Sequence, residues 1–200
     1  MIKIIVGLGN PGEKYAKTRH NAGEFYLAKL RNIWSDHDFT ESKTALWLQT
    51  KVGSEKVFLI FPTKMMNNSG EGLKKTLTTL KIKPKPADIL VMHDDLDIEL
   101  GRMKMSFGRS SAGHRGVESI IKILKSDKFW RLRMGIGLKK KPLSRAKSRG
   151  DGKKLIDFIL KKFSPAEERT LNKNFRKISV GLEIWLTNPA RAMSEINSTK

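Results

Sequence analysis

The 200-residue sequence contains no cysteine. A chain without thiols forms no disulfide, has no thiolate nucleophile and builds no cysteine metal site. Apolar residues make up 38% of the chain, and no apolar run approaches the roughly 20 residues that span a bilayer. The apolar segment 2–6 is too short for a secretory signal. These absences predict a soluble, cytoplasmic protein of ordinary domain size.

Acidic residues are scarce relative to basic ones. The 20 Asp and Glu residues face 40 Lys and Arg residues, which gives a net charge of +20 and a pI near 10.2. The excess lies in the second half, because residues 1–100 carry a net +3 and residues 101–200 a net +17. This half favours a polyanionic partner, since Lys and Arg that neutralise phosphates release counterions. A basic surface that serves only solubility is the alternative. A membrane surface is disfavoured, because no segment sets a wide Trp and Leu stripe opposite a basic face.

Strand-like and helix-like patterns alternate along the chain, which predicts an α/β fold. Strands are expected at 2–6, 45–52, 57–61, 88–93, 103–107 and 129–138, and helices at 21–34, 67–80, 114–124, 155–160 and 164–187. The last helix opens on a capping box, with Ser164 at the N-cap and Glu167 three residues later. The sequence shows no repeat and no second core. We therefore expect one domain over 1–188 and a loose C-terminal tail over 189–200.

Residues 139–154 form a strongly basic segment. Eight Lys and Arg residues face a single acid, Asp151, for a net charge of +7. So polar a segment does not collapse by itself, which predicts a flexible loop.

The first glycine motif, Gly7, Gly9 and Gly12 after a strand, matches a dinucleotide-binding fingerprint. That fold requires an apolar helix that opens at the turn and binds the pyrophosphate. Residues 13–19 are polar instead, which disfavours a nucleotide-dependent oxidoreductase. We expect the glycines to shape a loop that presents Asn10 and Tyr15 at the carboxyl end of a strand.

Metal ligation is weakly indicated. The four histidines show no His-x-x-x-His spacing, and a structural zinc site is disfavoured without cysteine. Four acids gather within 94–99 and could bind a hard cation, although such a cluster is more typical of an exposed strand end. We therefore expect neither a metal nor another cofactor.

Hydrolysis by an activated water molecule needs a histidine oriented by a carboxylate, together with amide donors for the developing oxyanion. His20 lies in a polar loop before a helix, and Asp94 ends a buried strand. If the two strands are parallel neighbours, both side chains reach one edge of the sheet, where Asn10 and Asn67 can join them. From spacing alone this indication is weak, because a lone histidine near a helix N-terminus is more often a capping or surface residue.

The segment GLGNPGEKYAKTRHNAG at 7–23 closely resembles the signature of bacterial-type peptidyl-tRNA hydrolases. Four further blocks resemble that family in the same order: PTKMMNNSG at 62–70, ILVMHDDLD at 89–97, GHRG at 113–116 and RLRMGIG at 131–137. The likeness spans about residues 2–187. It implies a single α/β domain with a twisted, mixed and mostly parallel sheet between helices. It also implies a monomer that needs no cofactor.

The resemblance implies hydrolysis of the ester between a peptide and the 3′-terminal ribose of tRNA, which recycles tRNA. His20 would then deprotonate water, and Asp94 would orient its imidazole. Asn10 would contact the peptide end of the substrate, and Asn67 would polarise the carbonyl. Met65 and Tyr15 would contact the substrate, Tyr15 near the terminal nucleotides.

Arg115 departs from the family pattern, because relatives commonly carry Asn between the His and the Gly of this block. Its guanidinium would either bind a phosphate of the tRNA 3′ end or point into solvent. The basic loop is the second departure, since it is longer and more basic than expected. It would either fold over the acceptor stem or remain solvated.

Contacts with tRNA are expected mainly at phosphates. The candidates share a basic side chain and are Lys104, Arg133, Lys139, Lys140, Lys141 and Arg145. A non-catalytic RNA-binding relative is the competing interpretation. The joint presence of Asn10, His20, Asn67 and Asp94 argues against it, and Arg115 argues mildly for it. Bacterial and organellar origins both remain open.

Overall fold

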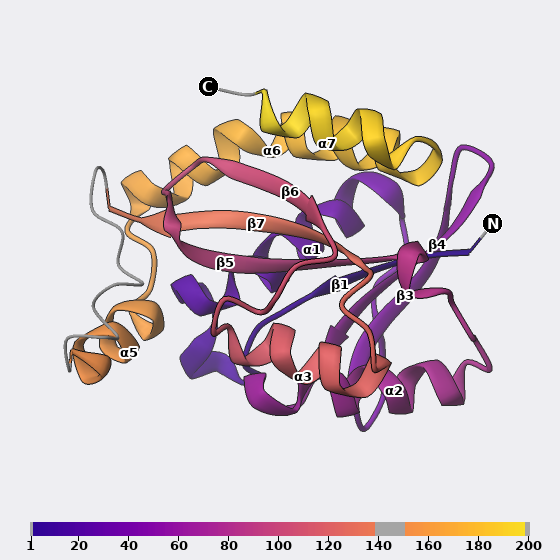
Figure 1. The fold of residues 1–200 in the computed structure, drawn as a ribbon, viewed down its shortest axis with the longest axis horizontal. Coiled ribbons are helices and arrows are strands. Elements are labelled where there is room, and N and C mark those ends of the chain that lie inside the picture. The colour runs from indigo at the N-terminus through magenta and orange to yellow at the C-terminus, as the bar shows by residue number, and fades with distance from the viewer. Residues whose placement is uncertain (1, 139–150, 199–200) are drawn as a thin grey trace.

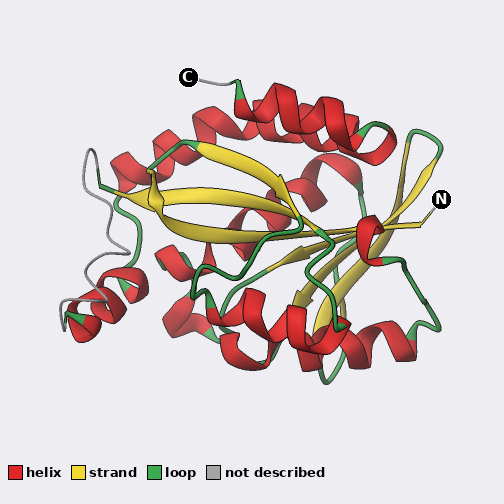
Figure 2. Ribbon diagram, in the orientation of Figure 1, coloured by secondary structure: helices red, strands yellow, loops and turns green. Residues whose placement is uncertain are grey.

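The structure is a computed structural model that describes residues 2–138 and 151–198. These residues fold around a seven-stranded sheet with helices on both faces (Figure 1 and Figure 2). The strands are β1 (Ile2–Gly7), β2 (Thr40–Glu41), β3 (Ala45–Val52), β4 (Glu55–Pro62), β5 (Ile89–Glu99), β6 (Met103–Phe107) and β7 (Trp130–Gly137). Their order across the sheet is β2-β3-β4-β1-β5-β7-β6.

The centre of the sheet is parallel and its edges are antiparallel. β1 pairs in parallel with β4 and β5, and β5 pairs in parallel with β7. The hairpin of β3 and β4, and β6 beside β7, add the antiparallel edges together with β2. The predicted α/β fold with a mixed sheet is confirmed. Because parallel strands run in the same direction, the loops that follow β1 and β4 lie at the same edge as the C-terminal part of β5, which extends beyond the end of β1.

Two helical layers enclose the sheet. The helices are α1 (Ala22–Trp34), α2 (Ser69–Thr79), α3 (Arg115–Leu124), α5 (Gly152–Leu160), α6 (Pro165–Thr187) and α7 (Pro189–Asn197). One core, which includes Tyr26 and Trp185, joins α1, α6 and α7 to the sheet, and a second core, which includes Leu73 and Val117, joins α2 and α3 to the opposite face. α5 lies beyond the carboxyl ends of the strands (Figure 1). No described helix combines the length and the apolar content that a membrane span requires.

The start of α6 follows from its sequence. The Ser164 hydroxyl accepts a hydrogen bond from the Glu167 backbone N–H at 3.4 Å, and the Ser164 N–H donates to the Glu167 carboxylate at 2.7 Å. This is the predicted capping box, and it satisfies two backbone groups that a helix end leaves open. Arg19 then ties this helix start to the loop of His20, because its guanidinium donates to Glu167 at 2.7 Å.

The C-terminal segment differs from the expected loose tail. Residues 189–197 form α7, whose Ala192 and Ile196 are buried in the core under α6. Pro189 begins this helix instead of only ending the previous one, because proline is favourable at the first helical position and the Asn188 side chain accepts the Arg191 N–H at 3.1 Å.

Three element boundaries also differ from prediction. The acidic segment 94–99 belongs to β5, because pairing with β7 extends through Asp95 and resumes at Glu99. α5 begins at Gly152, inside the segment predicted to be a flexible basic loop. Residues 67–68 do not cap α2 with their side chains but form a 3-10 turn, and the Ser69 hydroxyl donates to the Met66 carbonyl at 2.9 Å.

Because Gly23 has no side chain, the start of α1 can lie directly against the backbone of the sheet. A Cβ at this position would collide with the Met92 carbonyl oxygen and with the Leu8 backbone nitrogen. Backbone atoms of a sheet cannot move aside cheaply, so Gly23→Ala should lower the free energy of unfolding by about 3 kcal/mol or more. Urea denaturation measures the change. Gly152→Ala is the control, because no atom of the described residues lies within 4 Å of a Cβ there. Equal losses for the two variants would contradict the packing argument.

Candidate active site

A pocket of about 380 Å³ lies at the edge of the sheet where the central parallel strands end. Its walls come from the loops that follow β1, β4 and β6 and from the C-terminal part of β5, and α3 and α5 contribute the rest. Its lining includes Asn10, Tyr15, His20, Met65, Met66, Asn67, His93, Asp94, Asp95, Leu96, Asp97, Ser111, His114, Arg115, Leu155, Ile156, Ile159 and Leu160. The pocket therefore combines titratable groups and amides with an apolar wall from α5.

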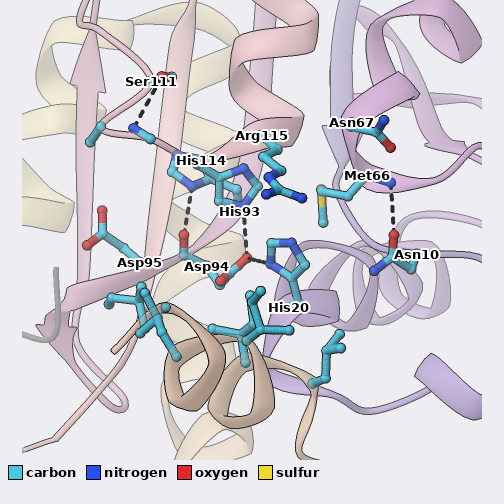
Figure 3. Close-up of a pocket in the computed structure, with 18 of the residues that line it drawn as sticks. Asn10, His20, Met66, Asn67, His93, Asp94, Asp95, Ser111, His114 and Arg115 are labelled. Carbon is cyan, nitrogen blue, oxygen red and sulfur yellow. Dashed lines mark hydrogen bonds and ion pairs between the residues drawn. The ribbon is translucent and has the colours of Figure 1, made fainter. Parts of the chain in front are cut away.

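Asp94 is the centre of this pocket, and one of its oxygens contacts two imidazoles (Figure 3). His20 Nδ1 and His114 Nε2 each lie 2.9 Å from Asp94 Oδ1. His20 comes from the 3-10 turn Arg19–Asn21 before α1, on one face of the sheet. His114 precedes α3, on the other face. The predicted meeting of His20 and Asp94 at one edge thus exists in the structure, since β1 and β5 are parallel neighbours.

Hydrogen bonding assigns the proton positions of these histidines. His114 Nδ1 accepts the Val117 backbone N–H at 3.3 Å, so the ring hydrogen lies on Nε2 and is donated to Asp94. His20 likewise donates from Nδ1 to the carboxylate, which places the lone pair of its neutral ring on Nε2. His20 Nε2 is then the atom that can accept a proton.

Asp94 stays ionised despite its burial. Its side chain is only 3% exposed, and burial by itself would raise the pKa of the carboxyl. His20 and His114 act in the opposite direction, through the positive charge that each ring carries when protonated and through their hydrogen bonds, and hold the pKa of Asp94 below its usual value. An ionised Asp94 can stabilise a positive charge on His20.

His93 is a third imidazole that contacts Asp94, through the backbone of that residue and not through its carboxylate. Its Nδ1 donates to the backbone carbonyl of Asp94 at 2.8 Å. Burial, followed by the neighbouring His114, lowers the pKa of His93 well below the ordinary value, so this ring remains neutral.

Asn10 is held rigidly by hydrogen bonds. Its backbone N–H and carbonyl bind the side chain of Asn21 at 2.9 Å each. Its side-chain oxygen accepts the Met66 backbone N–H at 2.8 Å. The amide oxygen is thereby fixed toward the β4 loop, and the amide nitrogen faces the side of the pocket where His20 lies (Figure 3). Asn67, from the same β4 loop, also lines the pocket.

The other predicted residues fall into two groups. Tyr15, Met65 and Arg115 line the pocket, as expected for substrate contacts. Lys104 and Arg133 lie outside it, opposite each other on β6 and β7. The remaining predicted tRNA contacts, Lys139, Lys140, Lys141 and Arg145, lie outside the described residues.

Comparison with known proteins identifies a family for the whole chain. The family model described as Peptidyl-tRNA hydrolase matches residues 4–200. Peptidyl-tRNA hydrolase of Aquifex aeolicus is 38% identical over 177 residues, 88% of this chain and 85% of that protein. Its counterpart in Bacillus thuringiensis is 35% identical over 198 residues, 98% of this chain and the full relative. The crystal structure of peptidyl-tRNA hydrolase from Acinetobacter baumannii superposes with a TM-score of 0.85 at 27% identity, over 100% of this chain and 96% of that one.

The chain belongs to the peptidyl-tRNA hydrolase family. The resemblance recognised in the sequence blocks and the predicted hydrolase class are thereby confirmed.

Sequence reasoning missed several residues of this family member's pocket. His114 received no role, although it stands in the GHRG block at the start of a predicted helix. The contribution of Asn21 to holding Asn10 has no signal in the sequence beyond its position after His20. The apolar residues Leu155, Ile156 and Ile159 were recognised as a helix but not as a wall of the pocket.

His20, Asp94 and His114 also have the donor types of a metal site. One ligand atom from each lies within 4.8 Å of the others. Each of the two nitrogens already carries the hydrogen of a 2.9 Å hydrogen bond to Asp94, and a metal would have to replace both hydrogens. Asp95, from the acidic cluster, accepts a hydrogen bond from Arg133 Nε at 2.8 Å. The contacts therefore fit an acid–base pair.

The neutral, buried His93 makes stability depend on pH. The unfolded chain binds a proton at this residue below about pH 6.5, whereas the folded protein does not. The stabilisation that the folded state gains from a neutral His93 is therefore complete above about pH 6.5. It is lost as the pH falls, at up to about 1.4 kcal/mol of unfolding free energy per pH unit. His93→Gln should reduce the fall in unfolding free energy between about pH 7.5 and 5.5 in urea titrations. The exposed His37→Gln is the control, and an unchanged fall in the His93 variant would refute the prediction.

Proposed function

We propose that this protein hydrolyses the ester between a peptide and the 3′-terminal ribose of tRNA, with His20 as general base. The observation that carries the proposal is the contact of His20 Nδ1 with the buried, ionised Asp94 at 2.9 Å. With that proton on Nδ1, Nε2 of His20 is the basic atom of the proposal, in a pocket that also offers amide and apolar groups to a substrate. Membership of the peptidyl-tRNA hydrolase family supplies the substrate class.

The reaction needs one proton to move twice. His20 Nε2 removes a proton from water while the water oxygen attacks the ester carbonyl carbon. Asp94 stabilises the imidazolium that forms, and the carbonyl oxygen becomes negative. The bond from carbon to the ribose 3′ oxygen then breaks, and His20 returns its proton to that oxygen. The products are a tRNA with a free 3′ hydroxyl and a peptide with a free carboxyl group.

Two asparagines of the pocket lining support this reaction. Asn67 polarises the ester carbonyl and donates to its oxygen as negative charge develops there. Asn10 contacts the peptide end. Because its amide oxygen is taken by Met66, the amide nitrogen is left to donate to a peptide carbonyl. An aminoacyl ester with a free amino group has no such carbonyl, so Asn10 favours N-acylated substrates.

Apolar and aromatic groups complete the substrate contacts. Met65 is exposed beside Asn67 and contacts the peptide, as does the α5 wall with the exposed Ile156. Tyr15 lies near the terminal nucleotides, where its ring offers a stacking surface.

The tRNA body binds the face that carries Lys104 and Arg133. The two residues are register partners on β6 and β7. Arg133 is oriented by Asp95 through its Nε, which leaves its terminal nitrogens for a phosphate. Lys139, Lys140, Lys141 and Arg145 extend this contact in the proposal. We also place the protein in the cytoplasm, where its substrate arises, and expect it to act as a monomer.

The proposed base is tested by His20→Asn, which keeps a polar side chain but loses the basic nitrogen. We expect turnover of N-acetyl-aminoacyl-tRNA to fall by about 10² to 10⁴-fold, because a general base contributes that much. Binding of the tRNA should persist. Release of N-acetyl amino acid without any added cofactor is the measurement, and His37→Asn is the control. Full turnover by a folded His20→Asn protein would refute the mechanism. Wild-type binding without release would favour a non-catalytic RNA-binding protein.

The tRNA face is tested by Lys104→Met. Removing one phosphate contact should weaken binding to different tRNAs alike and lower the slope of log affinity against log salt by about 1. Hydrolysis of an N-acetyl-aminoacyl ester of a single nucleoside should be unchanged. Lys177→Met on α6 is the matched control, because this exposed lysine lies on a helix that covers the other face of the sheet. An unchanged slope in Lys104→Met would exclude Lys104 from the contact.

A further inference from the structure

Arg115, an exposed residue, adds a positive charge to the lining of the pocket. It is the first residue of α3 and lines the cavity. In the close-up its guanidinium points into the space between His114 and Met66, above His20 (Figure 3). The side chain therefore faces the place where the ester of the proposed substrate must lie.

No protein group binds this guanidinium within the described residues 2–138 and 151–198, where Arg115 makes neither a hydrogen bond nor an ion pair. Two carboxylates of the pocket are already engaged elsewhere. Asp94 accepts from two histidines, and Asp95 pairs with Arg133 at 2.8 Å. The donors of Arg115 are thus available to a ligand.

The position of Arg115 does not serve the stability of α3. The N-terminus of a helix already carries a partial positive charge, so a cation in the first turn is unfavourable there. The same end of the helix, however, adds to the positive potential on this side of the pocket. An anion that enters the pocket would be attracted both by the guanidinium and by the N-terminus of α3.

The proposed reaction itself creates such an anion. Water adds to the ester carbon, the bond to the ribose oxygen breaks, and the acid that forms loses its proton to solvent at neutral pH, which leaves a carboxylate. This carboxylate arises beside Asp94, which is itself negative. Without a neighbouring cation the two charges repel each other.

We propose that Arg115 binds the oxygen atoms of the acyl group, first as the developing oxyanion and then as the carboxylate of the released peptide. A guanidinium suits this task because its planar donors match two carboxylate oxygens. The apolar wall formed by Met65, Ile156 and Ile159 would take the side chain of the C-terminal residue. The ligand class is therefore an N-acylated amino acid or peptide with a free carboxylate, which makes this protein sensitive to its product.

The inference rests on the proposed function for its substrate, but binding tests it without turnover. The probes are N-acetylphenylalanine and its uncharged amide, titrated by calorimetry or NMR. We expect the wild-type protein to bind the carboxylate about tenfold or more tightly than the amide, because a charged hydrogen bond is worth that much. Arg115→Gln keeps a donor but removes the charge, so it should bind both probes equally. Arg115→Lys should retain part of the preference.

Arg176→Gln is the matched control, since this exposed arginine lies on α6, away from the pocket, and should preserve the preference. Thermal melting of Arg115→Gln should show no loss of stability, which separates the effect from misfolding. Equal binding of the two probes by the wild type, or an undiminished preference in Arg115→Gln, would overturn the proposal. Weaker binding of adenosine 5′-monophosphate by Arg115→Gln, with carboxylate binding intact, would assign the residue to a phosphate and also overturn it.

An inhibition experiment distinguishes failure of this inference from failure of the proposed function. Competitive inhibition of peptidyl-tRNA hydrolysis by N-acetylphenylalanine should be about tenfold weaker in Arg115→Gln. If the wild type releases no acyl group yet prefers the carboxylate through Arg115, the proposed function fails and the anion site stands. If hydrolysis proceeds but the variants bind both probes as the wild type does, the inference alone fails.

Discussion

A carboxylate that is almost completely buried must keep its charge, and this constraint organises the centre of the molecule. The side chain of Asp94 is 3% exposed, and burial favours its neutral form. Two imidazole donors on one oxygen, at 2.9 Å each, offset that penalty. His114 can only donate through Nε2, because its Nδ1 is occupied in capping α3. In the proposed mechanism the other imidazole, on His20, is therefore the ring that accepts the proton, and the cap of α3 distinguishes the two histidines.

Sheet topology brings these groups together from distant parts of the chain. His20 and Asp94 are 74 residues apart, and Asn10 and Met66 are 56 apart. Parallel pairing of β1 with β4 and β5 places all three strand ends at one edge. The two cores hold the loops from opposite sides, since α1 follows His20 on one face and α3 follows His114 on the other. The loops of the site are consequently anchored to helices on both faces of the sheet.

The sequence predicted the parts of this arrangement that follow from local patterns. Alternating apolar segments predicted the α/β fold, and the rule that parallel strands end together predicted the meeting of His20 and Asp94. His114 was not predictable in this way, because its role depends on which ring nitrogen the first turn of α3 occupies. α7 was missed because Pro189 fits the end of one helix and the start of the next equally well. The early start of α5 was missed because the segment before Leu155 is strongly basic. A helix can nevertheless carry charged residues on one face while Leu155 and Ile156 line the pocket from another.

The proposed catalysis and the proposed tRNA binding require charges of opposite sign, and β5 and β7 carry both. An imidazolium needs a negative neighbour, whereas a phosphate backbone needs positive ones. Residues 94 and 95 supply the negative charge, and Arg133 lies across from His93 on the adjacent strand. Asp95 accepts the Arg133 Nε hydrogen at 2.8 Å, and this ion pair partly neutralises the carboxylate and orients the guanidinium. A phosphate bound there would be held at a fixed distance from Asp94 through one pair of neighbouring strands. The strand pairing, more than any flexible surface lysine, would then set where the 3′ end of the tRNA lies relative to His20.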